Sequence, residues 1–298
     1  MTLQAAIGRM LVAGASGTLG GPLAERAAAA GWDVTATYLT RPDRVRAGTP
    51  VRLDLRDPAA VRDVIDVTRP DAIIHAAVTE RSGEGYDDAI RLSGRHLADI
   101  AAARGIRLVA LSTDLVFDGA EGVYTEESPP RPAANSRYGA AKMDAERAIA
   151  AICPEALIVR TSLIYDFDPA NAQVAWMLTA LRRGEPLRLY TDQIRCPIWA
   201  VNLADALLEL AGKPVSGLLH VVGPEPVSRY DLGTALLDAL GYDGARLVEK
   251  ASAPDTHPKV LHLPVERARA ILDTPLLSIA EARARWERAA KTGGQPIQ

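Results

Sequence analysis

Short apolar stretches alternate with helix-like segments through the first half of the chain, and this alternation is the feature that most restricts the fold. Such an order predicts a parallel sheet with helices on both faces, a Rossmann-type doubly wound α/β fold. The predicted strands are residues 9–14, 33–38, 50–55, 71–78, 106–113 and 155–162. The predicted helices between them are residues 18–31, 57–70, 86–104 and 136–152.

The pattern becomes less regular after residue 162. Helix-like stretches near 170–183, 202–211, 228–240 and 278–290 are separated by connections that contain Pro and Gly. We expect residues 1–162 to form the sheet domain and residues 163–298 to form mainly a smaller C-terminal substrate-binding lobe. One apolar strand at 217–223 is expected to rejoin the sheet.

The composition is that of an ordinary globular protein: 298 residues, 48% hydrophobic, 24% charged, with a formal net charge of −3. This charge gives no reason to expect nucleic acid or an anionic membrane as a partner. The two cysteines are far apart and no metal-ligand spacing is present, so neither a disulfide framework nor a metal site is predicted. The N-terminus lacks a signal-peptide pattern, and no apolar run reaches the ~18–20 residues that cross a bilayer, which predicts a cytoplasmic protein.

A glycine-rich turn, "VAGASGTLGG" (12–21), joins the first predicted strand to the first helix. Glycines there let the backbone approach a pyrophosphate, and the helix N-terminus favours negative charge. The turn therefore predicts a bound dinucleotide. Its contacting residues are Gly14, Ser16, Gly17, Thr18, Leu19 and Gly20.

The end of the second strand indicates which nicotinamide cofactor binds. An acid usually meets a free ribose 2′-hydroxyl at this place. Here the chain reads "TYLTRPDR" (37–44) and offers Tyr38, Thr40, Arg41 and Arg44. Arginine can pair bidentately with a 2′-phosphate, which favours NADP(H) over NAD(H) and makes residues 1–162 an NADP-binding domain.

Residues after the third and fourth strands are placed to contact the adenine. Asp54 can accept from the adenine amino group while Leu55 packs on the ring, because Asp57 is the better N-cap for the next helix. His75 is interpreted as a packed strand-end residue. The small residues that follow it let the backbone lie close to a nucleotide, and they are Ala76, Ala77 and Val78.

A polar strand end and one helix face carry the predicted chemistry. Tyr138 and Lys142 are four residues apart on the helix 136–152 and share a face. A phenol has an ordinary pKa of about 10, and a neighbouring ammonium favours its ionised form. Thr113, at the carboxyl end of the strand 106–113, is expected to hold a substrate carbonyl oxygen beside Tyr138, and Asp114 to reach a sugar hydroxyl. The alternative is that "STD" (112–114) caps a turn.

Five segments resemble, in order, the extended short-chain dehydrogenase/reductase superfamily, and most closely its dTDP-4-dehydrorhamnose reductase branch. They are "GASGTLG", "LSTDLVFDG", "YGAAKMDAE", "RTSLIYD" and "DQIRCPIWAVNLADAL". The resemblance implies NADPH-dependent reduction of a 4-keto group on a nucleotide-activated deoxysugar, with Thr113, Tyr138 and Lys142 as the catalytic triad. It implies a nucleotide-sugar partner and allows a homodimer.

The same resemblance places further residues. Ser112 and Ser162 are expected at the cofactor. Asp114, Val116, Leu163, Arg195 and Trp199 are expected at the substrate, with Arg195 near its diphosphate and Trp199 stacking on a base or sugar, or else buried. The branch usually has Tyr, Trp and Gly where this chain has Leu115, Leu163 and Asp166.

Other functions remain open on the same fold. A sugar-nucleotide epimerase would keep and recycle its cofactor. A non-catalytic NADP-binding subunit would resemble the β subunit of methionine adenosyltransferase, although the Thr113–Tyr138–Lys142 set favours catalysis. A dehydratase is disfavoured because Leu115 stands where related dehydratases have a glutamate.

Overall fold

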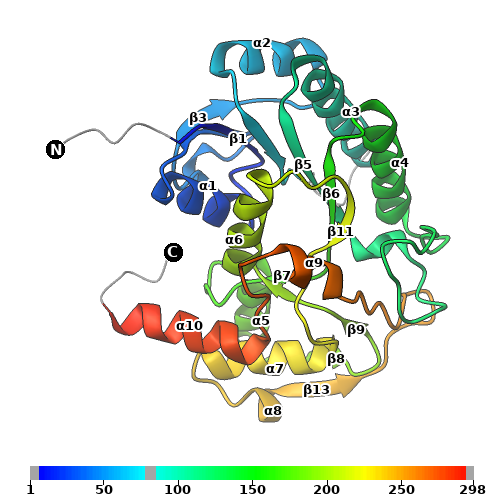
Figure 1. The fold of residues 1–298 in the computed structure, drawn as a ribbon. Coiled ribbons are helices and arrows are strands. Elements are labelled where there is room, and N and C mark those ends of the chain that lie inside the picture. Colours follow the sequence, from blue (N-terminus) through cyan, green and yellow to red (C-terminus); the bar gives the residue numbers. More distant parts are fainter. Residues whose placement is uncertain (1–6, 78–84, 293–298) are drawn as a thin grey trace.

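A seven-stranded parallel sheet forms the centre of the molecule, and the predicted Rossmann-type fold is confirmed (Figure 1). The computed structural model describes residues 7–77 and 85–292. The strand order is β11-β6-β5-β4-β1-β2-β3, and every adjacent pair is parallel. The strands are β1 (Arg9–Ala13), β2 (Asp33–Tyr38), β3 (Thr49–Arg52), β4 (Ala72–His75), β5 (Arg107–Thr113), β6 (Leu157–Thr161) and β11 (Gly217–His220).

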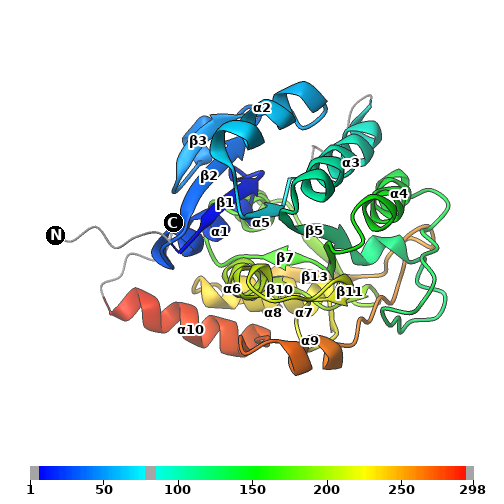
Figure 2. The same ribbon diagram turned by 45° about the horizontal axis from the view of Figure 1, so that its top comes forward.

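Helices cover both faces of this sheet. On one face lie α1 (Gly20–Ala29) and α6 (Ala200–Ala211), and on the other lie α2 (Pro58–Thr68), α3 (Tyr86–Arg104) and α4 (Arg137–Ile152) (Figure 2). Successive residues of β1 enter different cores: Met10 packs with α1, whereas Leu11 packs with α2 and α3. The two-residue period of a strand thus explains why the central strands are apolar on both faces.

Local signals in the sequence explain several helix ends. Asp57 is the N-cap of α2, since its carboxylate accepts from the amides of Ala59 at 2.9 Å and Ala60 at 3.2 Å. The helix starts with Pro58 and ends at Arg69, whose φ of 46° is left-handed. The N-cap predicted from the sequence is confirmed.

The lobe that follows β6 is built from helices and very short strand pairs. Its parallel pairs are β7–β10 and β8–β13, and its antiparallel pair is β9–β12. Its aromatic core includes Tyr165, Phe167 and Trp199. The lobe elements are β7 (Ile164–Tyr165), α5 (Ala172–Arg182), β8 (Leu187–Tyr190), β9 (Ile194–Arg195), β10 (Ile198–Trp199), β12 (Val227–Ser228), α7 (Arg229–Ala239), α8 (Gly244–Leu247), β13 (Val248–Ala251) and α10 (Ile279–Lys291). The short helix α9 (Glu266–Ile271) instead packs beside the sheet strand β11, with Ala268 in the main core.

The chain returns from the lobe to the sheet through β11, which pairs with β6 from Gly217 opposite Leu157 to His220 opposite Arg160. The sheet is therefore completed by residues that come after the first part of the lobe in the sequence. No helix within residues 7–77 and 85–292 is long and apolar enough to cross a membrane.

Candidate active site

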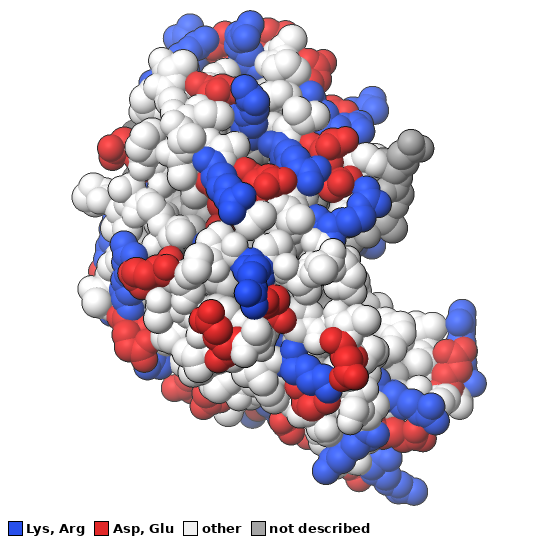
Figure 3. Space-filling model, turned by 90° about the vertical axis from the view of Figure 1, so that its right-hand side faces the viewer, with Lys and Arg blue, Asp and Glu red and all other residues white. Residues whose placement is uncertain are grey.

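A cavity of about 1160 Å³ opens at the carboxyl ends of the strands and continues along the lobe. It lies where the strand order reverses between β1 and β4, which is the usual ligand site of a doubly wound sheet. Figure 3 shows the surface indented between the upper part of the molecule and a lower part, with charges of both signs interspersed over this face. That distribution gives no sign of a large basic patch on the face shown.

The glycine-rich turn forms one wall of the cavity. Gly14 has a φ of 92°, and a Cβ there would lie 2.5 Å from the Cα of Ala77. A Cβ at Gly20 would lie 2.0 Å from the carbonyl oxygen of Gly14, so this glycine lets α1 begin close under the turn. Gly20 itself does not line the cavity. The turn residues that do are Gly14, Ser16, Gly17, Thr18 and Leu19.

At the ends of β2 and β3, most but not all of the residues predicted to contact the cofactor line the cavity. Tyr38, Thr40 and Arg41 line the cavity, but Arg44 is exposed on the 3-10 helix η1 (Pro42–Arg44) and does not. Asp54 and Leu55 also line it.

Asp54 has a partner that the sequence analysis did not consider. Arg56 donates to both carboxylate oxygens of Asp54, at 2.6–3.1 Å, and these hydrogen bonds hold the pKa of Asp54 below its usual value. The expected bond from an adenine amino group therefore has to compete with a neighbouring guanidinium. The spacing of two residues in "DLR" (54–56) was a local signal for this pair.

The end of β4 brings small residues to the cavity. Ala76 and Ala77 line it, and Val78 lies outside the described residues. His75 is buried, and its Nε2 lies 3.3 Å from the hydroxyl of Ser93. Burial, together with the charge of Lys142, lowers the pKa of His75 to about 3, so this ring is neutral at ordinary pH.

The polar end of β5 both caps a turn and lines the cavity. Thr113 is the N-cap of the 3-10 helix η2 (Asp114–Val116): its hydroxyl accepts from the amide of Leu115 at 3.2 Å and donates to the carboxylate of Asp114 at 3.2 Å. Ser112, Thr113 and Asp114 all line the cavity. The two interpretations of "STD" are thus both compatible with the geometry.

The face of α4 brings Tyr138 and Lys142 to the same cavity, and both side chains are buried. Ser136 starts this helix by accepting from the amide of Gly139 at 3.0 Å. The ammonium of Lys142 donates to the carbonyl of Leu111 on β5 at 2.9 Å, which joins the helix to the strand that carries Thr113. The residues of the expected triad therefore line one cavity.

Asp114 and Arg195 meet at the boundary between the sheet and the lobe. The hydroxyl of Ser162 donates to Asp114 at 2.6 Å, and the Nε of Arg195 lies 3.6 Å from the same carboxylate oxygen. The other guanidinium nitrogens of Arg195 donate to three carbonyls, those of Ile194, Lys259 and Pro258, at 2.7–3.1 Å. Arg195 lines the cavity, but its donors are engaged within the protein.

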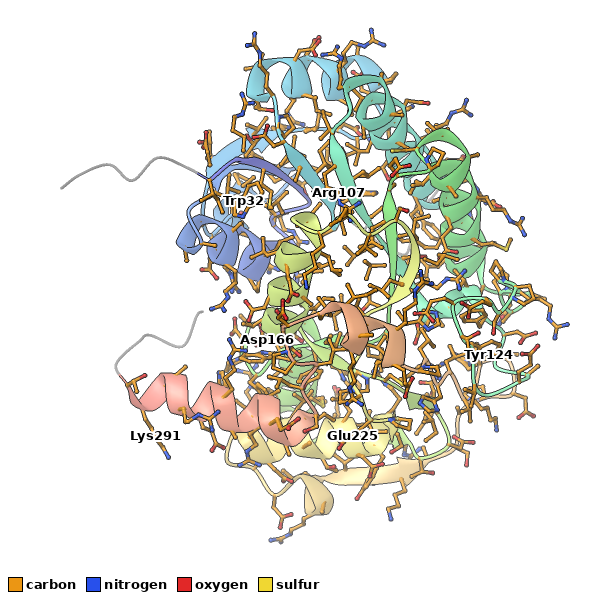
Figure 4. The ribbon with its side chains drawn as sticks, viewed as in Figure 1. Trp32, Arg107, Tyr124, Asp166, Glu225 and Lys291 are labelled. Atoms are coloured by element: carbon orange, nitrogen blue, oxygen red, sulfur yellow. The ribbon has the colours of Figure 1, made fainter. Side chains whose placement is uncertain are left out.

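Two residues expected at the substrate lie elsewhere. Val116 is fully buried in the main core and does not line the cavity, because η2 turns it inward. Trp199 is also absent from the cavity wall: its indole N–H donates to Asp166 at 3.1 Å. Figure 4 shows the position of Asp166 inside the lobe. Burial raises the pKa of Asp166. Leu163 does line the cavity, as does Ser162.

The lobe supplies further wall residues that the sequence analysis missed. Arg229, the first residue of α7, is partly exposed in the wall, and no side-chain hydrogen bond or ion pair engages its guanidinium within the described part of the chain. Burial and the charge of Arg195 lower its pKa. The other wall residues of the lobe that were missed are Ile164, Trp176, Arg188, Leu189, Tyr190, Gln193, His257 and Pro258. They come from several segments that are distant in sequence, so only the folded lobe brings them together.

Comparisons with known proteins show which proteins the chain is similar to. Residues 8–285 match the model of a family described as RmlD substrate binding domain. The dTDP-4-dehydrorhamnose reductase of Mycobacterium tuberculosis is 33% identical over 84% of this chain and 81% of its own length. The dTDP-4-keto-6-deoxy-D-glucose reductase of Streptomyces niveus is 33% identical over 80% and 81%. A crystal structure of dTDP-4-dehydrorhamnose reductase from Bacillus anthracis, in complex with NADP, superposes with a TM-score of 0.76 at 25% identity and covers 96% of this chain and 99% of that one.

Proposed function

The chain belongs to the RmlD substrate binding domain family, and from this premise we propose that it is a nicotinamide-dependent reductase of a 4-keto group on a nucleotide-activated deoxysugar. The names of its reductase relatives support oxidoreductase activity on such a substrate. The observation that carries the proposal is that Thr113, Tyr138 and Lys142 line one cavity together with the glycine-rich turn.

The residues of the turn fit a dinucleotide. Gly14 and Gly20 let backbone segments pack closer than a Cβ would allow, which keeps the turn tight where it lines the cavity. The turn leads into α1, and a helix N-terminus favours an anionic diphosphate. The NADP complex of the relative from Bacillus anthracis supports a nicotinamide cofactor. A preference for NADP(H) is supported by Arg41, which lines the cavity at the end of β2.

In this proposal the protein handles the proton and orients the ketone. A bound reduced nicotinamide supplies a hydride to the carbonyl carbon. Tyr138 donates its phenolic proton to the carbonyl oxygen, while Lys142 stabilises the resulting phenolate. The Thr113 hydroxyl has a single hydrogen, so it must leave Asp114 to donate to the substrate oxygen.

The lobe end of the cavity suits the nucleotide part of the substrate. Arg229 offers a guanidinium that can pair with a diphosphate, in place of Arg195, whose donors are engaged. Trp176 is half exposed in the same wall, and the rings of Tyr190 and His257 lie 6.5 Å apart beside it. Aromatic faces of this kind can stack on a base.

The central experiment measures NADPH oxidation against dTDP-, UDP- and GDP-linked 4-keto-6-deoxysugars. We expect turnover with at least one of them, and Tyr138→Phe to lower kcat at least ~100-fold while the Kd of NADPH changes less than about twofold. Tyr242→Phe is the matched control, because Tyr242 is exposed and does not line the cavity. A Tyr138→Phe variant with full activity would remove Tyr138 from the mechanism. Absence of turnover across the panel would reject the reductase proposal.

Cofactor preference is tested separately. Arg41→Ala should lower the ratio of kcat/KM for NADPH to that for NADH by about tenfold, the usual effect of losing a hydrogen bond to a charged group. Arg44→Ala is the control, because Arg44 does not line the cavity. Equal ratios in the wild type and the Arg41 variant would show that the 2′-phosphate is not bound here.

A further inference from the structure

Glu146 continues the catalytic face of α4 but lies beyond the cavity. Tyr138, Lys142 and Glu146 follow one another at intervals of four residues, which places them on one face of the helix. All three side chains are buried, but only the first two line the cavity. Glu146 is therefore the nearest point on this face at which the rest of the protein can hold the helix without entering the site.

Arg160 on β6 holds Glu146 through two hydrogen bonds. Its Nε donates to one carboxylate oxygen at 3.0 Å and its Nη2 to the other at 2.8 Å. Arg160 has no exposed surface and Glu146 is only 5% exposed. A guanidinium and a carboxylate joined by two parallel hydrogen bonds are fixed in relative orientation as well as in distance, because both groups are planar. A buried pair is not by itself evidence for stability, since the cost of desolvation offsets the attraction.

The pair also touches the strand end that carries Thr113. Arg160 lies opposite Ser112 in the register of β5 and β6, and Thr113 lies opposite Thr161. The Arg160 guanidinium stands 5.0 Å from the ring centroid of Phe117, the residue that follows η2. Phe117 in turn stacks on Tyr124 at 4.2 Å, in the loop at the edge of the molecule (Figure 4). One guanidinium thus contacts both the helix of Tyr138 and Lys142 and the segment after Thr113.

We propose that Arg160 and Glu146 are positioning residues that fix where α4 lies along its axis and how it is rotated about that axis. In this way they keep Tyr138 and Lys142 in position relative to Thr113. This proposal rests on the function proposed above. Lys142 already ties α4 to β5 through the carbonyl of Leu111, and the Arg160–Glu146 pair adds a second tie one helical turn away, to β6. Ion pairs of Arg91 with Asp144 and of Arg137 with Asp87 join α4 to α3, and the two ties to neighbouring strands oppose sliding and turning of the helix on the side of the sheet. Displacements of about 1 Å at a catalytic group commonly reduce turnover by a factor of ~100.

The test removes both charges together, so that neither is left buried alone. The double variant Arg160→Met/Glu146→Met should fold, because apolar residues of similar size often replace a buried pair. We expect kcat with the panel keto sugar that gives turnover to fall about 10- to 100-fold, and KM for NADPH to stay within about twofold. Glu146→Gln keeps the side-chain length and one acceptor, so it should lose less. A double variant with wild-type kcat overturns the proposal.

A control and a structural measurement separate positioning from general destabilisation. Asn202 is fully buried in α6 and does not line the cavity; its amide donates to the carbonyl of Pro275 and accepts from the amide of Leu277. Asn202→Leu should lower the thermal midpoint and leave kcat unchanged. Crystal structures of both variants with NADP⁺ should show α4 displaced only in the double variant. That measurement needs no turnover, so it stands even if the panel yields no substrate. An undisplaced α4 overturns the proposal, and Glu146→Gln supplies the same readouts if the double variant does not fold.

Discussion

Arg160 and Arg195 are both buried arginines that face a carboxylate, yet their surroundings differ. Arg160 meets Glu146 with two direct hydrogen bonds behind α4, outside the cavity. Arg195 lies 3.6 Å from Asp114 in the cavity wall, and its remaining donors bind three carbonyls. The first side chain joins a helix to a strand, whereas the second joins the 258–259 segment to the end of β5.

The difference shows why a buried arginine is not automatically a ligand group. A cation is available to a substrate anion only if the protein leaves some of its donors unengaged. Arg195 donates to the carbonyls of Lys259 and Pro258. We therefore propose that Arg229, rather than Arg195, contacts the diphosphate of the substrate. Three experiments test this comparison, beginning with the largest expected effect.

Removing Arg195 should have the largest effect on stability. Arg195→Met removes the guanidinium beside the buried carboxylate of Asp114, together with the side-chain donor of three carbonyls, of which only those of Ile194 and Lys259 keep a backbone donor. Losing one partner of a buried pair costs about 3–5 kcal/mol, which corresponds to a fall of roughly 5–15 °C in thermal midpoint. Differential scanning calorimetry measures this change in thermal midpoint. Adding Asp114→Asn should recover part of the loss, since it removes a buried negative charge that no longer faces Arg195. A single variant as stable as the wild type would mean that Asp114 does not need Arg195.

Removing Arg229 should affect binding and leave stability nearly unchanged. Arg229→Gln should raise KM for the nucleotide sugar about tenfold, since a hydrogen bond to a charged group contributes about 1.5 kcal/mol or more. The thermal midpoint should change by less than about 2 °C. Arg246→Gln on α8 is the control, because that side chain is remote from the cavity wall. An unchanged KM would mean that a residue other than Arg229 binds the diphosphate.

The smallest effect near neutral pH is expected at His220, which lies beside Arg160. Burial and the charge of Arg160 lower the pKa of His220 to about 3, although Glu126 lies 4.0 Å away. The folded protein therefore binds fewer protons at this ring than the unfolded chain does. Its free energy of unfolding should fall as the pH drops through the window from about 6.5 to 3, by about 1.4 kcal/mol per unit.

Urea unfolding at several pH values tests whether the free energy of unfolding falls as the pH drops. His220→Leu should make the loss of stability between pH 7 and pH 5 less steep, and His75→Leu should act in the same direction, because the pKa of His75 is also lowered to about 3. Identical slopes in the wild type and the His220 variant would show that this ring does not control the acid sensitivity of the Arg160 region.

Most of the sheet could be predicted from the sequence because its signals are local. Buried apolar runs mark β1, β4, β5 and β6, the side chain of Asp57 caps α2 within three residues, and the glycine-rich turn lies between neighbouring elements. The Asp54–Arg56 pair was equally local and could have been found. The interval of four residues from Lys142 to Glu146 was visible as well, but its partner Arg160 lies in another strand.

The lobe could be predicted only in outline, because its organisation depends on distant partners. Two-residue strands such as β9 carry no periodicity, and β9 pairs with β12 more than 30 residues later. Dependence on distant partners also explains why Trp199 and Val116 were wrongly predicted to contact the substrate. A tryptophan beside a predicted site can stack on a ligand or donate to a buried carboxylate, and only the position of Asp166 decides between them. Arg229 was missed although a helix was predicted at 228–240, because a helix start does not by itself indicate that its first residue faces a cavity.

The return of the chain to the sheet through β11 has a consequence for synthesis on the ribosome. Until residues 217–220 emerge, β6 is an outer strand whose unpaired amides and carbonyls can join another chain. His220 pairs with the backbone of Arg160, so the same step encloses the guanidinium that holds α4. A nascent chain that has completed only its first 162 residues would therefore contain the glycine-rich turn, but β6 and the Arg160 side chain behind α4 would still be uncovered. The two walls of the cavity should reach their final structure at different times during translation.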